Sequence, residues 1–181
     1  RYQRPVFLVG ESLGGAVAIL AALEVPDKVA GMVLAGPAVR EGIRLRYGWN
    51  AAIASAAFLA PGYRLTVDRR PDDPHLADHS AQRLATDPRV IRNVRMDAYW
   101  GLIKLADSAS DRAPSIQTPS LLLYGGKDNS VPAAGISHLH DHLASHGEYR
   151  FYPEGPHLLL QGPRWQQVAD DILDWIDRTP H

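Results

Sequence analysis

The stretch Pro5-Val-Phe-Leu-Val-Gly10-Glu-Ser-Leu-Gly14 joins a short apolar run to a G-x-S-x-G motif. The run from Pro5 to Gly10 is bounded by proline and glycine, which is typical of a strand that is buried on both faces of a parallel sheet. The small residues from Gly14 to Leu23 predict a helix directly after the motif. A buried strand, a sharp turn and a helix in this order indicate an α/β fold.

Three further apolar stretches predict strands, at Val29–Ala35, Ser120–Tyr124 and, more weakly, Tyr149–Tyr152. Helices are predicted at Ala133–Ser145 and from near Pro163 to the C-terminal end. Strands that alternate with helices favour an open, mostly parallel sheet, because each parallel strand needs a crossover connection. Ligands of such sheets bind beyond the carboxyl ends of the strands.

The last predicted helix has one apolar face at the period of 3.6 residues. Its members are Trp165, Val168, Ala169, Ile172, Leu173 and Ile176. We expect this face to pack on the sheet.

Residues 37–113 contain no stretch that predicts a buried strand, and Pro-containing breaks divide them into amphipathic pieces. We predict an inserted helical cap here, with helices at Tyr47–Leu59, Leu76–Thr86 and Val90–Leu105. Residues 1–36 and 114–181 then form the core of the α/β fold. The expected architecture is a sheet with an inserted cap.

Composition and charge narrow the possible functions. The 181 residues include 19 Lys and Arg against 20 Asp and Glu, and this net charge of -1 favours neither a nucleic-acid partner nor a polybasic membrane patch. The chain has no cysteine, which excludes disulfides and thiolate chemistry and is compatible with the expected cytoplasmic location. No apolar run reaches the roughly 20 residues that a transmembrane helix needs.

Ser12 lies at the centre of the G-x-S-x-G motif, in the strand-turn-helix context that a nucleophilic serine requires. Gly10 and Gly14 flank this serine. We expect that neither position tolerates a side chain, because the strand and the helix approach each other closely there. The backbone N–H of Leu13 then lies at a helix N-terminus, where it can donate a hydrogen bond to a developing oxyanion.

A serine hydroxyl becomes nucleophilic when an imidazole takes its proton and a carboxylate orients that imidazole. Asp128 follows the Ser120–Tyr124 strand, and His157 follows the Tyr149–Tyr152 strand, so both are expected at the carboxyl edge of the sheet. The rival aspartates, which we expect on the surface, are Asp68, Asp72, Asp73, Asp78 and Asp141.

His138 and His142 are four residues apart in a predicted helix, which is a spacing that can chelate a metal. The sequence lacks the glutamate of an H-E-x-x-H motif at this place, and no carboxylate-rich partner motif accompanies it. We therefore interpret the cluster as a polar helix face and expect neither a metal nor a cofactor.

These motifs resemble those of the monoacylglycerol lipase and lysophospholipase group of α/β-hydrolases, which is related to the serine aminopeptidases. The resemblance runs from about Pro5 to Ile176 and is carried by Val9-Gly-Glu-Ser-Leu-Gly-Gly15, Leu123-Tyr-Gly-Gly-Lys-Asp128 and Tyr152-Pro-Glu-Gly-Pro-His-Leu-Leu159. It implies that Ser12, Asp128 and His157 form a catalytic triad. Members of the group also carry N-terminal strands with a loop that supplies a second oxyanion donor. Nothing before Arg1 represents that loop, so we expect a chain without its N-terminal part.

The resemblance implies a serine hydrolase that cleaves carboxylic esters through an acyl-enzyme, with a small-molecule or lipid ester as substrate. We expect monoacylglycerols or lysophospholipids, because apolar side chains in the predicted cap suit an acyl chain. These side chains are Ile53, Phe58, Leu59, Tyr99, Trp100 and Leu102. They equally suit a small core of the cap itself. The alternatives are an aminopeptidase, a short-chain esterase or a non-catalytic binding protein on the same scaffold.

Overall fold

The computed structural model describes residues 6–41, 44–143 and 146–180, and its centre is a four-stranded parallel sheet. The strand order is β1 (Val6–Glu11), β2 (Val29–Ala35), β5 (Ser120–Gly125) and β6 (Gly147–Tyr152). All three neighbouring pairs are parallel, which confirms the predicted sheet. Predicted ranges that include residues 1–5, 42–43, 144–145 or 181 lie outside the described residues at those positions.

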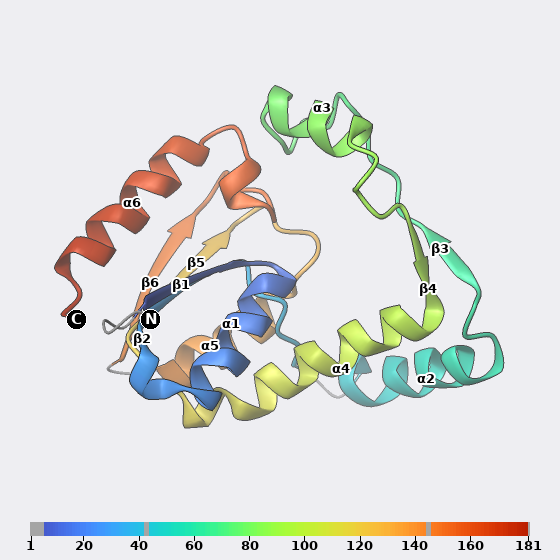
Figure 1. Ribbon diagram of the computed structural model, residues 1–181, viewed down its shortest axis with the longest axis horizontal. Helices are drawn as coiled ribbons and strands as arrows, with labels where there is room; N and C mark the ends of the chain where they lie inside the picture. Colours follow the sequence, from blue (N-terminus) through green and yellow to red (C-terminus); the bar gives the residue numbers. More distant parts are fainter. Residues whose placement is uncertain (1–5, 42–43, 144–145, 181) are drawn as a thin grey trace.

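Helices cover both faces of this sheet (Figure 1). One face carries α1 (Leu13–Glu24), α4 (Met96–Arg112) and α5 (Ala133–Leu143), and the other carries α6 (Trp165–Arg178). Each face has its own buried apolar cluster, because successive side chains of a strand point to opposite sides. In β2, for example, Leu34 packs in the first cluster and Val33 in the second.

The two central strands are buried along their whole length, whereas β1 and β6 are partly exposed. This pattern explains why β2 and β5 read as continuous apolar runs, since both of their faces are covered by helices. It also explains why Tyr149–Tyr152 gave only a weak strand signal. This edge strand alternates exposed and half-buried residues, and it begins earlier, at Gly147.

The apolar face of α6 is rotated relative to the prediction. Val168 and Ile172 are buried as expected, but Leu173 is 58% exposed and Trp175 is 5% exposed. The ring of Trp175 packs edge-on against Phe7 of β1, with the ring centroids 5.9 Å apart. The prediction for Leu173 was therefore wrong, because the sheet accommodates a large ring beside Gly31, where a Cβ would lie 2.8 Å from the Trp175 ring.

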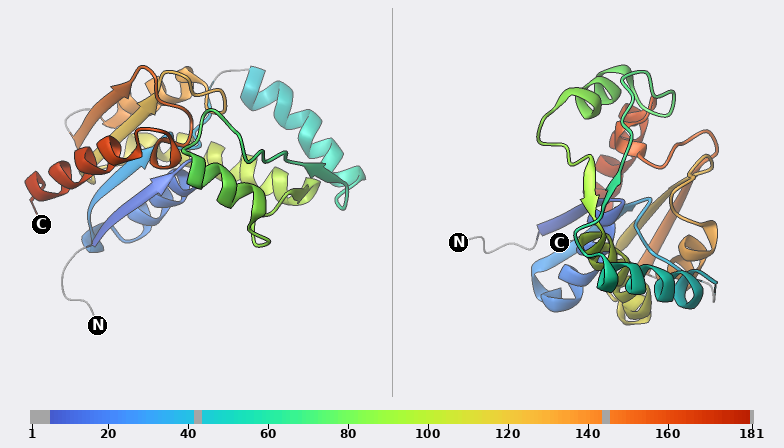
Figure 2. Two further views of the ribbon diagram at one scale, coloured as in Figure 1. Left: turned by 90° about the horizontal axis from the view of Figure 1, so that it is seen from above. Right: turned by 90° about the vertical axis from the view of Figure 1, so that its right-hand side faces the viewer.

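The described part of residues 37–113 contains three α-helices, a π-helical segment at Arg44–Trp49, and one pair of short strands that the sequence did not indicate. The helices are α2 (Asn50–Leu59), α3 (Asp78–Thr86) and α4, and the antiparallel strands are β3 (Arg64–Thr66) and β4 (Asn93–Arg95). The predicted helix Val90–Leu105 was wrong at its start, because β4 pairs with β3 and α4 begins at Met96. Figures 1 and 2 show α2, α3 and the two short strands beyond the carboxyl ends of the sheet. The division into core and cap stays a prediction.

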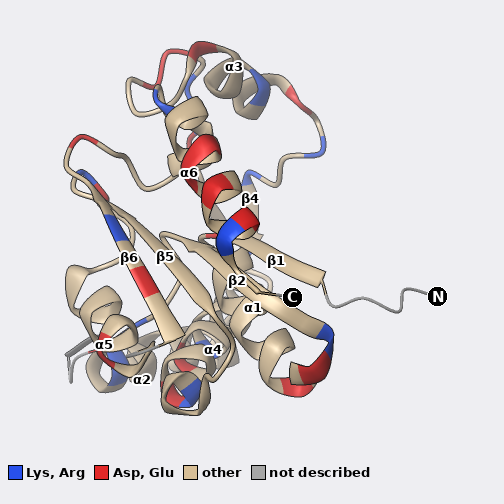
Figure 3. Ribbon diagram, turned by 90° about the vertical axis from the view of Figure 1, so that its left-hand side faces the viewer, with Lys and Arg blue, Asp and Glu red and all other residues tan. Residues whose placement is uncertain are grey.

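Charged residues of both signs are spread over the described chain, and acidic residues lie along α6 (Figure 3). Asp171 of this helix pairs with Arg150 of β6, with Nη1 and Oδ1 2.6 Å apart. The pair holds the helix against the edge of the sheet. None of the helices in the described residues combines the length and the apolar character that a bilayer crossing requires.

Candidate active site

Ser12 occupies the turn between β1 and α1 in a strained backbone conformation. Its φ of 54° and ψ of -120° make it the one non-glycine residue of the described chain with positive φ. Backbone hydrogen bonds hold the turn: Ser12 N–H donates to the Ala35 carbonyl (2.9 Å), and the Ser12 carbonyl accepts from Gly15 and Ala38 (3.0 and 2.8 Å). The neighbouring strand β2 therefore fixes the conformation that presents the hydroxyl.

The glycines of this turn differ in how much space surrounds them. A Cβ at Gly10 would lie 2.3 Å from the Gly14 carbonyl oxygen, so this position excludes any side chain. A Cβ at Gly14 would meet no atom of the described residues within 4 Å, so the expectation that Gly14 must lack a side chain was wrong. The second crowded position is Gly15, where a Cβ would lie 2.6 Å from the Pro37 Cβ.

Ser12, His157 and Asp128 form one hydrogen-bonded chain, although 145 residues separate the serine from the histidine. His157 Nε2 lies 2.8 Å from Ser12 Oγ, and His157 Nδ1 lies 2.9 Å from Asp128 Oδ2. An ionised carboxylate only accepts hydrogen bonds, so we assign the imidazole proton to Nδ1. Nε2 is then free to accept the Ser12 hydroxyl proton, which is the arrangement that a general base requires.

The Asp128 side chain is fully buried, and its second oxygen is also satisfied. Oδ1 accepts hydrogen bonds from the backbone N–H groups of Ser130 and Val131, at 2.8 and 2.9 Å. Burial raises the pKa of this carboxyl, but the hydrogen bonds from His157, Val131 and Ser130 outweigh it, and the pKa falls below its usual value. Asp128 is thus held as a carboxylate that orients the imidazole.

Leu13 is the first residue of α1, and helix geometry leaves its backbone N–H without an acceptor inside the helix. The positive end of the helix dipole adds to the attraction of this N–H for a negative oxygen. The N–H of the residue after the serine is also the one that a G-x-S-x-G turn offers to an oxyanion. The position predicted for this donor is therefore compatible with the fold.

Most of this chain matches one known protein family. The family described as serine aminopeptidase, S33, matches residues 1–164. The chain belongs to this family. It is 29% identical over 177 residues to a monoacylglycerol lipase of Mycolicibacterium smegmatis, covering 95% of this chain and 62% of that protein. It is 54% identical over 177 residues to the rat monoglyceride lipase, covering 96% of this chain and 57% of that protein.

Solved structures agree with the assignment of the fold. The crystal structure of a monoacylglycerol lipase from Paleococcus ferrophilus superposes with a TM-score of 0.79 at 24% identity, covering 98% of this chain and 70% of that one. This S33-family chain therefore has the α/β-hydrolase fold. It spans about 62% of the length of the mycobacterial relative.

The rival aspartates of the S33-family chain are either bonded to other groups or exposed. Asp72 pairs with Arg70 at 3.0 Å, and Asp73 accepts the backbone N–H of His75 at 2.9 Å. Asp141 is exposed beside His140 on α5. Asp68 and Asp78 are exposed in the segment that carries α3. In the described residues, Asp128 is the aspartate that meets His157.

The His138–His142 pair is occupied by contacts within the protein. His142 Nδ1 lies 2.7 Å from the His138 carbonyl oxygen, and His138 Nε2 lies 3.2 Å from the Ser110 carbonyl oxygen. No group of three or more potential metal-binding side chains among the described residues has the geometry to hold an ion. The interpretation as a polar helix face accounts for these contacts.

A pocket of about 390 Å³ lies between the helices of the predicted cap and the loop after β5 that carries Asp128, here called the acid loop (residues 126–132). Its lining includes Ser130 and Val131, whose N–H groups bind Asp128, and it includes Ile53, Tyr99 and Leu102 of the predicted apolar wall. The prediction was wrong for Phe58 and Leu59, which are 86% and 79% exposed because they lie on the outer face of α2. Trp100 is half-buried, with the Lys104 ammonium 6.0 Å from its ring.

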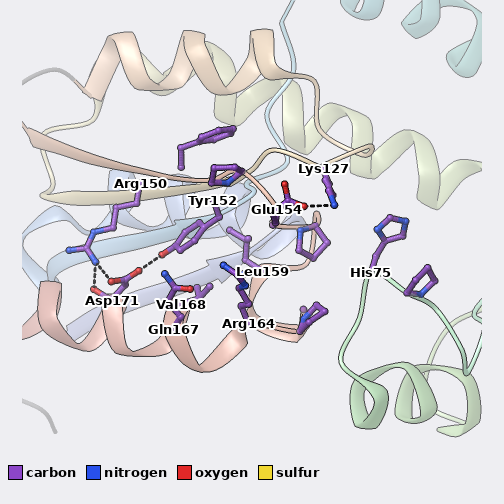
Figure 4. A pocket seen from close by; sticks show the side chains of 17 residues that line it. His75, Lys127, Arg150, Tyr152, Glu154, Leu159, Arg164, Gln167, Val168 and Asp171 are labelled. Atoms are coloured by element: carbon purple, nitrogen blue, oxygen red, sulfur yellow. Dashed lines mark hydrogen bonds and ion pairs between the residues drawn. The ribbon is translucent and has the colours of Figure 1, made fainter.

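A larger pocket, of about 750 Å³, lies between β6, α6 and the loop that follows β6 (Figure 4). Several of its polar side chains bond to one another: Tyr152 donates to Asp171 at 2.7 Å, and Lys127 pairs with Glu154 at 2.5 Å. Burial and the hydrogen bond to Asp171 raise the pKa of Tyr152 above its usual value. Ser12 and His157 line neither pocket: the larger one reaches Pro156 and Lys127, the chain neighbours of His157 and Asp128, and the smaller one reaches Ser130 and Val131, which bind Asp128.

Proposed function

We propose that this chain carries the catalytic residues of a serine hydrolase that cleaves carboxylic esters, with Ser12 as nucleophile, His157 as base and Asp128 as acid. The observation that carries the proposal is the hydrogen-bonded chain from Asp128 through His157 to Ser12 at the strained turn. The similarity to proteins named monoacylglycerol lipase and monoglyceride lipase supports it.

In the proposed mechanism, the Ser12 hydroxyl oxygen attacks the ester carbonyl carbon while His157 Nε2 takes the hydroxyl proton. The Leu13 N–H stabilises the resulting oxyanion, and Asp128 stabilises the imidazolium through Nδ1. The imidazolium then gives its proton to the departing alcohol, and an acyl-enzyme on Ser12 remains. Water, deprotonated by the same imidazole, attacks the acyl carbon, and the bond from this carbon to Ser12 Oγ breaks. The imidazolium returns its proton to Ser12 as the carboxylic acid leaves.

The proposed substrates are lipid monoesters, namely monoacylglycerols or lysophospholipids. The apolar pocket beside the acid loop supports this class, because Ile53, Leu102 and Ile103 offer a surface for an acyl chain. In this proposal, residues 37–113 form the cap that encloses the chain, and residues 1–36 and 114–181 form the core. The cytoplasmic location is likewise a proposal, and the lack of cysteine is compatible with it.

The family description raises the aminopeptidase as the second candidate. A free substrate amine would need an unpaired carboxylate near the site. Of the anionic residues that could bind such an amine, Asp72 pairs with Arg70, Asp73 accepts the His75 backbone N–H, and Asp78 is exposed on α3. The similarity to proteins named lipase favours the esterase.

Labelling with a fluorophosphonate probe tests the nucleophile. We expect the protein to be labelled, Ser12→Ala to lose labelling completely, and Ser55→Ala, an exposed serine of α2, to retain it. A folded protein without labelling would contradict the proposal and favour the non-catalytic binding protein. Hydrolysis of aminoacyl anilides in preference to esters would favour the aminopeptidase.

The acyl pocket is tested by filling it. We expect Ile53→Trp to lower kcat/KM for a decanoyl ester by about tenfold or more and to leave an acetyl ester nearly unchanged. Leu59→Trp is the matched control, because Leu59 lies on the same helix but is exposed. Equal losses for both esters, or equal effects of both variants, would argue against an acyl chain in this pocket.

A further inference from the structure

Glu11, the residue before Ser12, directs its carboxylate toward the loop that carries His157. Its Oε1 accepts the backbone N–H of Leu160 at 2.8 Å, and its Oε2 accepts the side-chain amide of Gln161 at 2.9 Å. Leu160 and Gln161 belong to a short 3₁₀ turn, Leu159–Gln161, that begins two residues after His157. One side chain thus joins the serine turn to the histidine loop across about 150 residues of sequence.

The same short turn is anchored at two further points. The backbone carbonyl of Gln161 accepts the N–H of Ala77, at 2.8 Å, and Ala77 directly precedes α3. Leu159 is buried in the apolar cluster on the α6 side of the sheet. Glu11 therefore supplies the link that connects this turn to the nucleophile, while the other contacts connect it to the sheet core and to the segment that leads into α3.

A carboxylate suits this position for a physical reason. Each oxygen of Glu11 receives one N–H group, and hydrogen bonds to an ionised acceptor are stronger than those between neutral groups. A misplacement of about 1 Å at a reacting centre costs about a hundredfold in rate. The separation of His157 Nε2 from Ser12 Oγ depends on how firmly the two loops are joined.

We propose that Glu11 is a positioning residue that, together with Gln161, clamps the histidine loop to the serine turn and so holds His157 within hydrogen-bonding reach of Ser12. This inference rests on the proposed hydrolase function. Glu11 does not touch the reacting atoms, since both of its oxygens bind Leu160 and Gln161. Glu11 affects the reaction only by fixing the position of His157.

Exchange of the two side chains provides the sharpest test. We expect Glu11→Ala to lower kcat for a short-chain ester by about 10- to 100-fold, with KM changed less than about twofold. Gln161→Glu alone sets two carboxylates against each other and is expected to cause a similar loss. The double variant Glu11→Gln with Gln161→Glu keeps both hydrogen bonds, with the second one reversed, and is expected to recover kcat to within about threefold of the original.

A second readout does not depend on catalysis. Hydrogen exchange at the Leu160 amide is expected to accelerate at least about tenfold in Glu11→Ala and to return to the original rate in the double variant. Glu24→Ala is the matched control, because Glu24 is an exposed glutamate on the adjoining helix α1 and is expected to change neither readout.

The outcomes separate the two proposals. Unchanged kcat and unchanged Leu160 exchange in Glu11→Ala would overturn the clamp, as would a double variant that recovers neither. A protein that is never labelled at Ser12 would overturn the hydrolase function. In that case faster exchange in Glu11→Ala would still support the joining of the two loops, and unchanged exchange would overturn it.

Discussion

At the scale of single residues, the candidate site combines a strained serine with a buried carboxylate. Ser12 and Asp128 follow different strands, and each is held by backbone hydrogen bonds that do not depend on the other. His157 bridges them, with one ring nitrogen on each side. Several independent contacts therefore determine where the imidazole lies. In our proposal, the contacts of Glu11 with the histidine loop are one of them.

The buried carboxylate links stability to pH. The pKa of Asp128 is lower in the folded protein than its usual value of 3.8, so the folded state binds this proton more weakly than the unfolded state does. The stabilisation that ionised Asp128 gives to the fold is fully present above the pKa that this carboxyl has in the unfolded chain. It is lost as the pH falls through the lower pKa of the folded protein. We expect the free energy of unfolding to decrease on acidification below about pH 4.

Asp128→Asn is expected to remove that part of the pH dependence, as measured by urea unfolding between about pH 7 and pH 3. Asp141→Asn, which alters an exposed residue of α5, should leave the dependence unchanged. Parallel curves for the original protein and Asp128→Asn would contradict the assigned direction of the pKa. The same variant should lower kcat by about 10⁴-fold if His157 is the base, because an amide favours the wrong tautomer.

At the scale of elements, the packing of β1 against α1 depends on Gly10 more than on Gly14. We expect Gly10→Ala to destabilise the protein by about 1–3 kcal/mol or more and to abolish labelling at Ser12, because its Cβ would overlap the Gly14 carbonyl oxygen. Gly14→Ala is expected to be tolerated, or to stabilise α1 by up to about 1 kcal/mol. Denaturant unfolding with probe labelling of both variants tests this, and equal damage from both would count against it.

The packing of α6 offers a second matched pair. Trp175→Ala should cost about 3–5 kcal/mol, because the ring is buried against Phe7 and Gly31. Leu173→Ala, on the exposed side of the same helix, should stay within about 0.5 kcal/mol. Urea unfolding of the two variants is the measurement. A larger decrease in the free energy of unfolding for Leu173→Ala would instead support the apolar helix face, including Leu173, that the sequence predicted.

At the scale of the whole molecule, a buried polar cluster joins the segment after β2 to α2 and α4. Arg40 Nη1 lies 3.1 Å from Asp107 Oδ1, and the Asn50 amide donates to Asp107 Oδ2 at 2.6 Å. The side chains of Arg40 and Asp107 are each 12% exposed. Arg46 extends the cluster to Asp111 on the last turn of α4.

Removal of Asp107 tests whether this cluster fixes the position of α2. We expect Asp107→Ala to lower the free energy of unfolding by about 3–5 kcal/mol, because it removes the carboxylate that binds both the Arg40 guanidinium and the Asn50 amide in a largely buried place. It should also raise KM for long-chain esters, because Arg40 and Ile53 line the same pocket. Asp97→Ala breaks an exposed pair with Arg95 and should change neither quantity. Equal stability of the two variants would contradict the prediction.

The sequence by itself determined the parallel sheet and the three side chains of the candidate site. The strands β2 and β5 are buried on both faces and so leave uninterrupted apolar runs, and Ser12, Asp128 and His157 each follow a strand. Turn chemistry and strand ends are local features, and local features are visible in sequence.

Only the tertiary structure decided the rest. The burial of Trp175 in place of Leu173, the open space at Gly14 and the short strands β3 and β4 depend on neighbours that are distant in sequence. The bonds of Glu11 to Leu160 and Gln161 are of the same kind, since they span about 150 residues. Sequence periodicity predicts which residues share one face of a helix or strand. Which neighbours that face packs against is determined by the folded structure alone.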